Sequence, residues 1–285
     1  MKNPAPLPAG ARPGLLGDTS SRDYSRKLCQ FNVFAEPELR RLISNLGLRS
    51  GMRVLDAGCG TGEALPWLLD AVKPSGHVVG IDLASAHVDA ARVHASVNIE
   101  VLQGDLLTAP VAPKSFDFIW CVNTINHLRD PVRGVTTLMA LLRPCGRIAL
   151  GQSSFLPDMY FAWDSRLERL VNEAVRRYYR ERYSLEEGEL TAVRALAGTL
   201  RAAKLQNVAA RSILIERISP LDAATEQYLV DTLFTNTWGK RVQPYLSHED
   251  YAELVRLCDP RHPEFALRRA DFHFLQSFTV VTGQI

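Results

Sequence analysis

Short apolar runs recur along residues 51–151 and are separated by stretches whose apolar residues have helical spacing. Each run is rich in β-branched and aromatic residues and is bounded by turn residues, which predicts a strand. The predicted strands cover residues 53–56, 78–82, 99–102, 116–122 and 147–150. Because these strands alternate with helices, we expect an α/β fold whose parallel sheet is covered on both faces.

The same periodicity places four helices between and before these strands. They cover residues 36–43, 63–70, 85–95 and 132–142. Pro66 lies in the first turn of the second helix, where proline is tolerated because that N–H has no helical partner. The first helix is expected to open at Glu36 and to end near Gly47.

After residue 150 the pattern changes. Residues 155–186 form a helical stretch rich in aromatics and arginine, with the arginines between 166 and 182. A helix at 191–205, a strand at 208–216, a helical stretch at 221–258 and a strand at 272–281 follow. The two helical stretches are predicted insertions, at about 155–190 and 219–262, that cap the carboxyl end of the sheet. Substrate pockets are usually built there.

Composition limits the class of protein without naming it. The chain has 285 residues, 46% of them hydrophobic and 22% charged, and a net charge of +2. A net charge this small does not indicate a surface that binds nucleic acid. No apolar stretch approaches the length that spans a membrane. Residues 1–20, rich in proline and glycine, are expected to be a disordered or loosely packed tail before one domain at 21–285. The five cysteines lack a CxxC pair, which favours reduced thiols in the cytoplasm and no metal site.

The segment VLDAGCGTGE at residues 54–63 carries the strongest functional signal. A buried strand, a glycine turn and a helix N-terminus create a site where a ligand can lie against bare backbone. A dinucleotide fingerprint would need a small residue at position 63, where a glutamate stands. The pattern is D-x-G-x-G-x-G instead, which disfavours a nicotinamide oxidoreductase.

These residues resemble the class I S-adenosylmethionine (SAM)-dependent methyltransferases, and the resemblance covers about Gly51 to Gly151. Further positions support it in order along the chain: Asp82, Gly104-Asp105, Ser115-Phe116-Asp117 and Leu141 to Arg147. The resemblance implies a Rossmann-like, doubly wound, seven-stranded and mostly parallel sheet. It also implies SAM as the cofactor and a small-molecule substrate of the kind found in quinone and natural-product modification.

The resemblance further implies which residues hold SAM. Asp82 would accept from the ribose hydroxyls, and Asp105 with the Leu106 backbone would meet the adenine. Leu83 and Val122 would contact the cofactor through apolar and backbone groups. The remaining expected cofactor-binding residues belong to the glycine turn and its surroundings, namely Asp56, Gly58, Cys59, Gly60, Gly62 and Tyr24.

The acceptor side is less determined. His127, just past the fourth strand, is a candidate general base or a structural histidine. No [DN]PP[YF] motif follows that strand, which disfavours the adenine- and glutamine-modifying types. No carboxylate pair follows the fifth strand, which disfavours magnesium-dependent catechol chemistry. The aromatics of the two insertions, Phe234 and Trp238 among them, could line an apolar pocket or pack a core. We therefore expect methylation of O, N or C in a fairly apolar metabolite, with a SAM-binding scaffold or non-methyl chemistry as the alternative.

Overall fold

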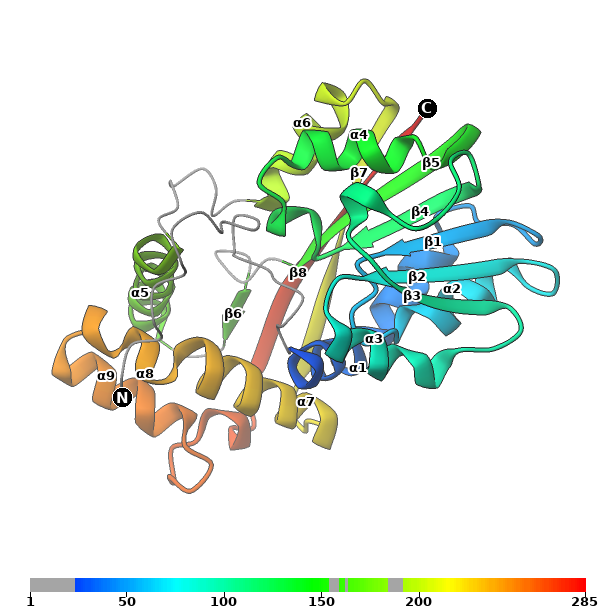
Figure 1. Ribbon diagram of the computed structural model, residues 1–285. Helices are drawn as coiled ribbons and strands as arrows, with labels where there is room; N and C mark the ends of the chain where they lie inside the picture. The colour runs from blue at the N-terminus through cyan, green and yellow to red at the C-terminus, as the bar shows by residue number, and fades with distance from the viewer. Residues whose placement is uncertain (1–23, 154–158, 162–163, 184–191) are drawn as a thin grey trace.

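The computed structural model describes residues 24–153, 159–161, 164–183 and 192–285 (Figure 1). The expected tail at residues 1–20 lies outside these ranges. Within them one sheet contains eight strands in the order β3-β2-β1-β4-β5-β8-β6, with β7 also paired to β8. The strands are β1 Arg53–Ala57, β2 His77–Asp82, β3 Ile99–Gln103, β4 Phe116–Val122, β5 Leu142–Ser153, β6 Met159–Phe161, β7 Gln206–Ile218 and β8 His273–Gln284.

These eight strands occupy seven side-by-side positions. Strand β7 pairs along the whole of β8, from Gln206 with Gln284 to Ile218 with His273, and so takes one edge of it. Strands β5 and β6 must therefore share the other edge, β5 along residues 278–284 and β6 along 274–276. The first five strands are parallel and β8 is antiparallel to its neighbours. The expected seven-stranded, mostly parallel and doubly wound sheet is therefore observed.

Helices cover both faces of the sheet, and Figure 1 shows the two layers on opposite sides. Helices α1, α2 and α3 pack with one face and share a buried cluster with Val54, Val78 and Phe118. Helices α4 and α6 pack on the other face, against Leu55 and Ile148. The ranges are α1 Ser25–Ser44, α2 Ala64–Val72, α3 Ser85–Ala91, α4 Pro131–Met139 and α6 Ala192–Ala202.

A third group of helices lies beyond the carboxyl end of the parallel strands, at the lower left of Figure 1. We call this group the cap. Its members are α5 Ser165–Tyr183, α7 Ala223–Gln227, the π-helix η5 Tyr228–Trp238, α8 Gly239–Val242, η6 Gln243–Tyr245, α9 His248–Cys258 and η7 Ala266–Arg268. Across the described ranges, no helix is both long enough and apolar enough to cross a bilayer.

Helix α1 differs most from its sequence-based prediction, because it begins at Ser25 and not at Glu36. Proline removes a helical hydrogen bond, so Pro37 was expected to stand at the start of the helix and in fact lies inside it. Phe31 and Phe34 explain the extension, since both are buried and the ring of Phe34 stacks on Tyr228 with centroids 4.2 Å apart. Tertiary burial of these rings outweighs the local cost of the proline.

Two smaller differences concern the later part of the chain. Strand β6 interrupts the stretch that was predicted as helical from residue 155 onward, because residues 159–161 pair with β8. The helical stretch predicted from 221 to 258 breaks into several helices, one of which is the π-helix η5. Hydrophobic periodicity cannot show such breaks, because neighbouring helical turns differ little in their pattern.

Candidate functional site

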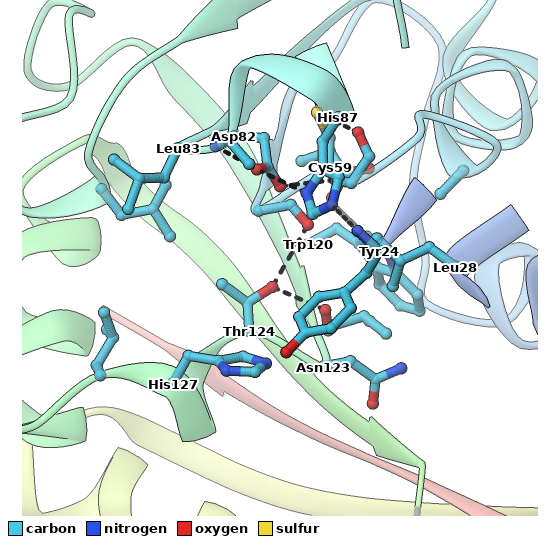
Figure 2. A pocket seen from close by; sticks show the side chains of 18 of the residues that line it. Tyr24, Leu28, Cys59, Asp82, Leu83, His87, Trp120, Asn123, Thr124 and His127 are labelled. Carbon is cyan, nitrogen blue, oxygen red and sulfur yellow. Dashed lines mark hydrogen bonds and ion pairs between the residues drawn. The ribbon is translucent and has the colours of Figure 1, made fainter. Parts of the chain in front are cut away.

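A cavity of about 400 Å³ opens at the carboxyl ends of β1, β2 and β4, beside the first turns of α1. Open α/β sheets bind ligands at this edge. Figure 2 shows side chains from several elements converging on the cavity. Its lining includes ten of the eleven expected cofactor-binding residues and His127; Gly62 is the exception.

The glycine turn is tied to the end of β2 by its backbone. The N–H groups of Gly58 and Cys59 both donate to the carbonyl of Ile81, at 2.8 and 3.0 Å. Gly58 has a φ of +81°, and a Cβ there would lie 2.3 Å from Thr124 Oγ1. Only glycine therefore allows the turn to approach the segment after β4 so closely.

Gly62 serves packing within the same turn. A Cβ at this position would lie 2.8 Å from the Cβ of Ala91 in α3. Gly62 thus lets the turn approach the end of α3 closely. Its assignment as a cofactor-binding residue remains a prediction, and it is not among the residues that line the cavity.

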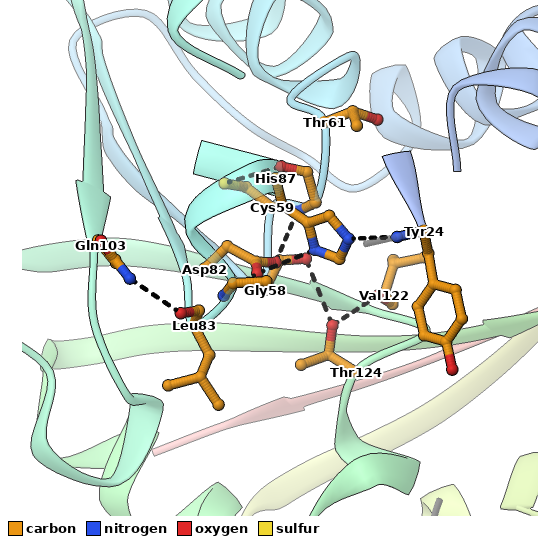
Figure 3. A network of polar contacts seen from close by, with 12 residues as sticks. Tyr24, Gly58, Cys59, Thr61, Asp82, Leu83, His87, Gln103, Val122 and Thr124 are labelled. Atoms are coloured by element: carbon orange, nitrogen blue, oxygen red, sulfur yellow. Dashed lines mark hydrogen bonds and ion pairs between the residues drawn. The ribbon is translucent and has the colours of Figure 1, made fainter. Parts of the chain in front are cut away.

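Asp82, the last residue of β2, holds its carboxylate at the centre of a hydrogen-bond network, shown in Figure 3. Its Oδ2 accepts from the Gly60 N–H at 2.9 Å, and its Oδ1 accepts from the Ala84 N–H at 2.9 Å. The Nδ1 of His87 lies 3.1 Å from the same Oδ1. The carboxylate is therefore fixed between the glycine turn and the start of α3.

Asp56 lies in β1 with 2% of its surface exposed, and it lines the same cavity. Burial, reinforced by the negative charges of Asp82 and Glu63, raises the pKa of the Asp56 carboxyl to about 8. A cation placed in the cavity would relieve this unfavourable environment. The site thus favours a positively charged group close to Asp56.

Apolar residues also line the cavity. Leu83, Leu106 and Val122 do so together with Asp105, whose Oδ1 accepts from the Leu107 N–H at 2.9 Å. Leu83 is exposed for 37% of its surface, a high value for a leucine beside a cavity. Apolar groups and one carboxylate suit a flat, weakly polar ring such as adenine.

Cys59 contributes shape to the site and no nucleophile. Burial, with the nearby Asp56 and Asp82 charges, raises the pKa of the Cys59 thiol well above its ordinary value. A protonated thiol is a poor nucleophile. All five cysteines are free.

Tyr24 and His127 line the cavity from two different segments, the N-cap of α1 and the short helix η3 Ile125–His127. In Figure 2 the phenol of Tyr24 points across the cavity toward the imidazole of His127. These two side chains were expected from sequence to lie near the cofactor or the acceptor. Their roles there remain predictions.

Several residues that line the cavity were missed by the sequence analysis. Leu28, Phe31 and Asn32 belong to the part of α1 that was not predicted as helix. Trp67 and Trp120 lie deeper, while Asn123 and Thr124 follow β4, where a φ of +52° at Asn123 marks a sharp turn. His87 was missed as well, and its place five residues after Asp82, one turn into α3, is the one signal in the sequence that could have indicated it.

The residues present fit SAM by their chemistry. SAM carries an adenine, a ribose diol and a methionine ammonium beside a sulfonium, and the cavity offers apolar side chains, a fixed carboxylate and a buried acid to meet them. Its volume of about 400 Å³ lies in the range of pockets for small ligands. Asp56 with its raised pKa is the observation that most favours a cationic ligand.

Comparison with known sequences supports the same class. Residues 54–146, about a third of the chain, match the family described as a methyltransferase domain. The 27-O-demethylrifamycin SV methyltransferase of Amycolatopsis mediterranei is 34% identical over 123 residues, 41% of this chain and 44% of that protein. The demethylmenaquinone methyltransferase of Staphylococcus aureus is 27% identical over 117 residues, 40% of this chain and 48% of that protein. The chain thus matches less than half the length of these curated relatives.

Solved structures share the fold over nearly the whole chain. A methyltransferase structure from Bacillus halodurans C-125 has a TM-score of 0.52 at 18% identity and covers 87% of this chain and 98% of its own. A chain from the complex between the Haloferax volcanii Trm112 methyltransferase activator and a methyltransferase has a TM-score of 0.53 at 19% identity. It covers 92% of this chain and 94% of its own. At such identities these likenesses show the fold alone.

Sequence match, fold and cavity chemistry agree. Residues 54–146 match a methyltransferase domain, and the fold and the cavity chemistry agree with the class I SAM-dependent type, whose cofactor is S-adenosylmethionine.

Proposed function

We propose that this enzyme transfers the methyl group of SAM to an oxygen, nitrogen or carbon of a small, fairly apolar organic metabolite. The observation that carries the proposal is the cavity itself, which is lined by the apolar residues Leu28, Phe31 and Trp120 as well as by carboxylates. The names of two relatives agree with it, since a rifamycin and a menaquinone precursor are both largely apolar molecules.

Methyl transfer asks little of the protein beyond positioning. SAM supplies an electrophilic methyl group on a positively charged sulfur, so orientation and exclusion of water provide much of the acceleration. Under this proposal Asp82 and Asp105 hold the nucleoside, and Asp56 lies toward the methionine ammonium. Tyr24 and Phe31 exclude water from the cavity.

The cap is proposed to shape the acceptor site. Not all of the aromatic residues that the sequence suggested for an apolar pocket contribute to the described cavity. Phe234 and Trp238 are buried and stack on each other with ring centroids 5.4 Å apart, so they stabilise the cap and do not line the described cavity. Tyr160, Phe161 and Trp163 lie outside the residues whose side chains are described. The apolar acceptor is therefore inferred from the cavity wall and the relatives.

The arginine-rich part of α5 is largely engaged within the cap. Arg166 forms ion pairs with Asp250 and Glu253 of α9, at 2.5 and 3.0 Å. The guanidinium of Arg177 lies 5.0 Å from the ring centre of Tyr245. These contacts favour a structural role for the helix over recognition of an acidic substrate.

The division of the chain follows the same proposal. Residues 21–285 are taken as one methyltransferase domain, and the segments at about 155–190 and 219–262 as insertions that form its lid. We further propose that the enzyme acts in the cytoplasm, since its free cysteines suit a reducing compartment. Neither a nucleic acid nor a membrane is proposed as a partner.

An acceptor screen tests the proposal. Purified enzyme is incubated with SAM labelled in its methyl group, and transfer is measured to three sets of compounds: quinone precursors and polyketides, catechols, and highly polar metabolites. Transfer to the first set is expected. Methylation of only the polar set would overturn the apolar acceptor, and SAM binding without turnover on any set would favour a scaffold or non-methyl chemistry.

His127→Ala separates a general base from a structural histidine. A base near the acceptor requires that turnover fall about 10²–10⁴-fold, with a changed pH profile and unchanged SAM affinity. A structural role predicts loss of thermal stability and of SAM affinity together. His127→Gln, which keeps the size and polarity of the side chain, serves as the matched variant.

A further inference from the structure

His87 joins two parts of the cavity proposed to hold SAM, which we call the donor cavity: the end of β2 and the start of α1. It is 7% exposed, and its Nδ1 lies 3.1 Å from Asp82 Oδ1 while its Nε2 accepts from the Tyr24 N–H at 3.0 Å (Figure 3). Because Nε2 accepts a hydrogen bond, the proton of the neutral ring must sit on Nδ1, which then donates to Asp82. One imidazole thus links β2 to the N-cap of α1.

The hydrogen bonds of Asp82 leave little room for a ligand. An ionised carboxylate has about four acceptor positions. Oδ1 uses both of its positions, for the Ala84 N–H and for His87 Nδ1, whereas Oδ2 uses one, for the Gly60 N–H. As far as the described residues occupy this carboxylate, one position therefore remains, on Oδ2, while His87 stays in place.

We infer that His87 is a positioning residue of the donor site, which turns Asp82 so that it accepts from one ribose hydroxyl and fastens the start of α1 to the same carboxylate. This inference rests on the proposed use of the cavity for SAM. It goes beyond that proposal, because it assigns a role to a histidine that touches neither the acceptor nor the methyl group. It also links donor binding to the docking of α1.

The proposed link between donor binding and the docking of α1 follows from the residues that α1 contributes to the cavity. Tyr24, Leu28 and Phe31 line the cavity from its first turns, and the rings of Tyr24 and His87 stack with centroids 6.4 Å apart. A ligand that strengthens the orientation of Asp82 therefore strengthens the His87–Tyr24 contact, and this contact holds one wall of the cavity in place.

Three substitutions of His87 separate its two hydrogen bonds. The amide nitrogen of asparagine lies where Nδ1 lies in histidine, so His87→Asn keeps the donor to Asp82 and loses the acceptor for Tyr24. The terminal amide of glutamine lies where Nε2 lies, so His87→Gln keeps the acceptor for Tyr24 and loses the donor to Asp82. His87→Ala loses both, and His77→Asn, at an exposed histidine that starts β2, is the control.

Binding of S-adenosylhomocysteine (SAH) and of its 2′-deoxy and 3′-deoxy analogues is measured by calorimetry. The wild-type enzyme is expected to lose about tenfold in affinity for one analogue and little for the other, because Asp82 serves one hydroxyl. The difference should persist in His87→Asn and in the control. It should disappear in His87→Gln and His87→Ala, where Oδ1 becomes free to accept from the second hydroxyl.

Exchange of the Tyr24 amide proton tests the tether to α1. With selectively ¹⁵N-labelled tyrosine, this proton should be protected in the wild type and in His87→Gln, and exchange several-fold faster in His87→Asn and His87→Ala. Addition of SAH should slow the exchange in the wild type alone. Equal exchange rates in all four proteins would overturn the tether.

Binding affinities and amide exchange rates together distinguish failure of the positioning role from failure of the proposed SAM site. Equal losses for both deoxy analogues in the wild type, or an unchanged difference in His87→Ala, would overturn the positioning role while leaving the SAM site intact. Absence of SAH binding by the wild type would overturn the proposed use of the cavity, and the positioning role with it. The exchange rates without SAH would still decide whether His87 tethers α1.

Discussion

Two regions of the molecule contribute to stability in different ways. One is the cap, and the other is formed by the carboxyl ends of β1, β2 and β4 around the cavity, which we call the donor edge. The donor edge buries Asp56 close to Asp82 and Glu63, and it forces Gly58 into a left-handed backbone conformation. The cap instead buries apolar side chains against one another, such as Phe234 between Trp238 and Phe265. One region keeps groups with unfavourable electrostatics or backbone conformation in position, and the other region gains stability by burying apolar side chains.

This difference shows why the two regions carry different kinds of information. Functional sites often break local rules of stability, and the broken rules are visible in a sequence as unusual residues. A packed cap follows the ordinary rules, so its sequence resembles that of many other helical segments. Four substitutions test whether the contrast holds.

Phe234→Ala should have the largest effect, and it should act on stability. Truncating a buried phenylalanine costs about 3–5 kcal/mol of unfolding free energy, and Phe234 is 4% exposed. Chemical denaturation measures the loss, with Val255→Ala at an exposed position of α9 as the control. If SAH affinity in the folded fraction fell as steeply as stability, the cap and the donor site would not be separable.

Gly58→Ala should damage the donor edge itself. The substitution combines a φ of +81° with a Cβ placed 2.3 Å from Thr124 Oγ1, so a cost of about 2–3 kcal/mol in stability and a loss of SAH binding are expected. Gly198→Ala is the matched control, because nothing lies within 4 Å of a Cβ there. That change within α6 should stabilise the protein by about 0.5–1 kcal/mol. Similar results for the two glycines would contradict the assigned role of Gly58.

The ligand-free Asp56→Asn variant should be more stable than the wild type, and the difference should grow as the pH increases. The folded-state pKa of Asp56 is about 8, above its unfolded value, so the folded protein binds the extra proton and loses stability as the pH rises from about 4 to 8. Between pH 5 and 8 the wild type should lose stability that the asparagine variant keeps, by at most about 1.4 kcal/mol per pH unit. SAH affinity should fall in the same variant. Parallel stability curves for the two proteins would show that Asp56 is not a buried acid of this kind.

Asp82→Ala should weaken SAM binding by about 1–2 kcal/mol, which corresponds to the loss of one hydrogen bond to a charged acceptor. Calorimetry measures the change, and Asp89→Ala, at an exposed aspartate in α3, is the control. Unchanged affinity would mean that the ribose site has been misplaced.

The sequence predicted the parallel part of the sheet closely and α1 poorly. Strand β4 matches its predicted bounds, Phe116–Val122, because a continuous apolar run is typical of a buried parallel strand. Helix α1 depends on contacts between Phe31, Phe34 and Tyr228, residues almost 200 positions apart that no local pattern connects. The same long-range burial places Pro37 inside the helix.

Most of the residues expected to bind SAM lie at the cavity because they stand at or just after the end of a strand, and their contact with SAM stays a prediction. Asp82 ends β2 and Val122 ends β4, so their places at one edge follow from strand order alone. His87 and Leu28 could not be found this way, since they reach the cavity from helices whose rotation depends on tertiary packing. The acceptor remained open for a similar reason, because the cap is held by ordinary packing contacts.

Tryptophan fluorescence offers a way to observe the donor cavity and the cap separately. Trp67 and Trp120 line the donor cavity, whereas Trp238 is buried in the cap against Phe234. Indole emission is sensitive to its immediate surroundings, so each region carries its own fluorophore. The chain has a fourth tryptophan, Trp163, which is replaced by phenylalanine in both proteins. With Trp238 also replaced by phenylalanine, quenching by SAH would follow the donor cavity, and the emission lost with Trp238 would describe the cap. Stopped-flow fluorescence of the two proteins would then show whether an acceptor changes the cap before or after the donor cavity fills.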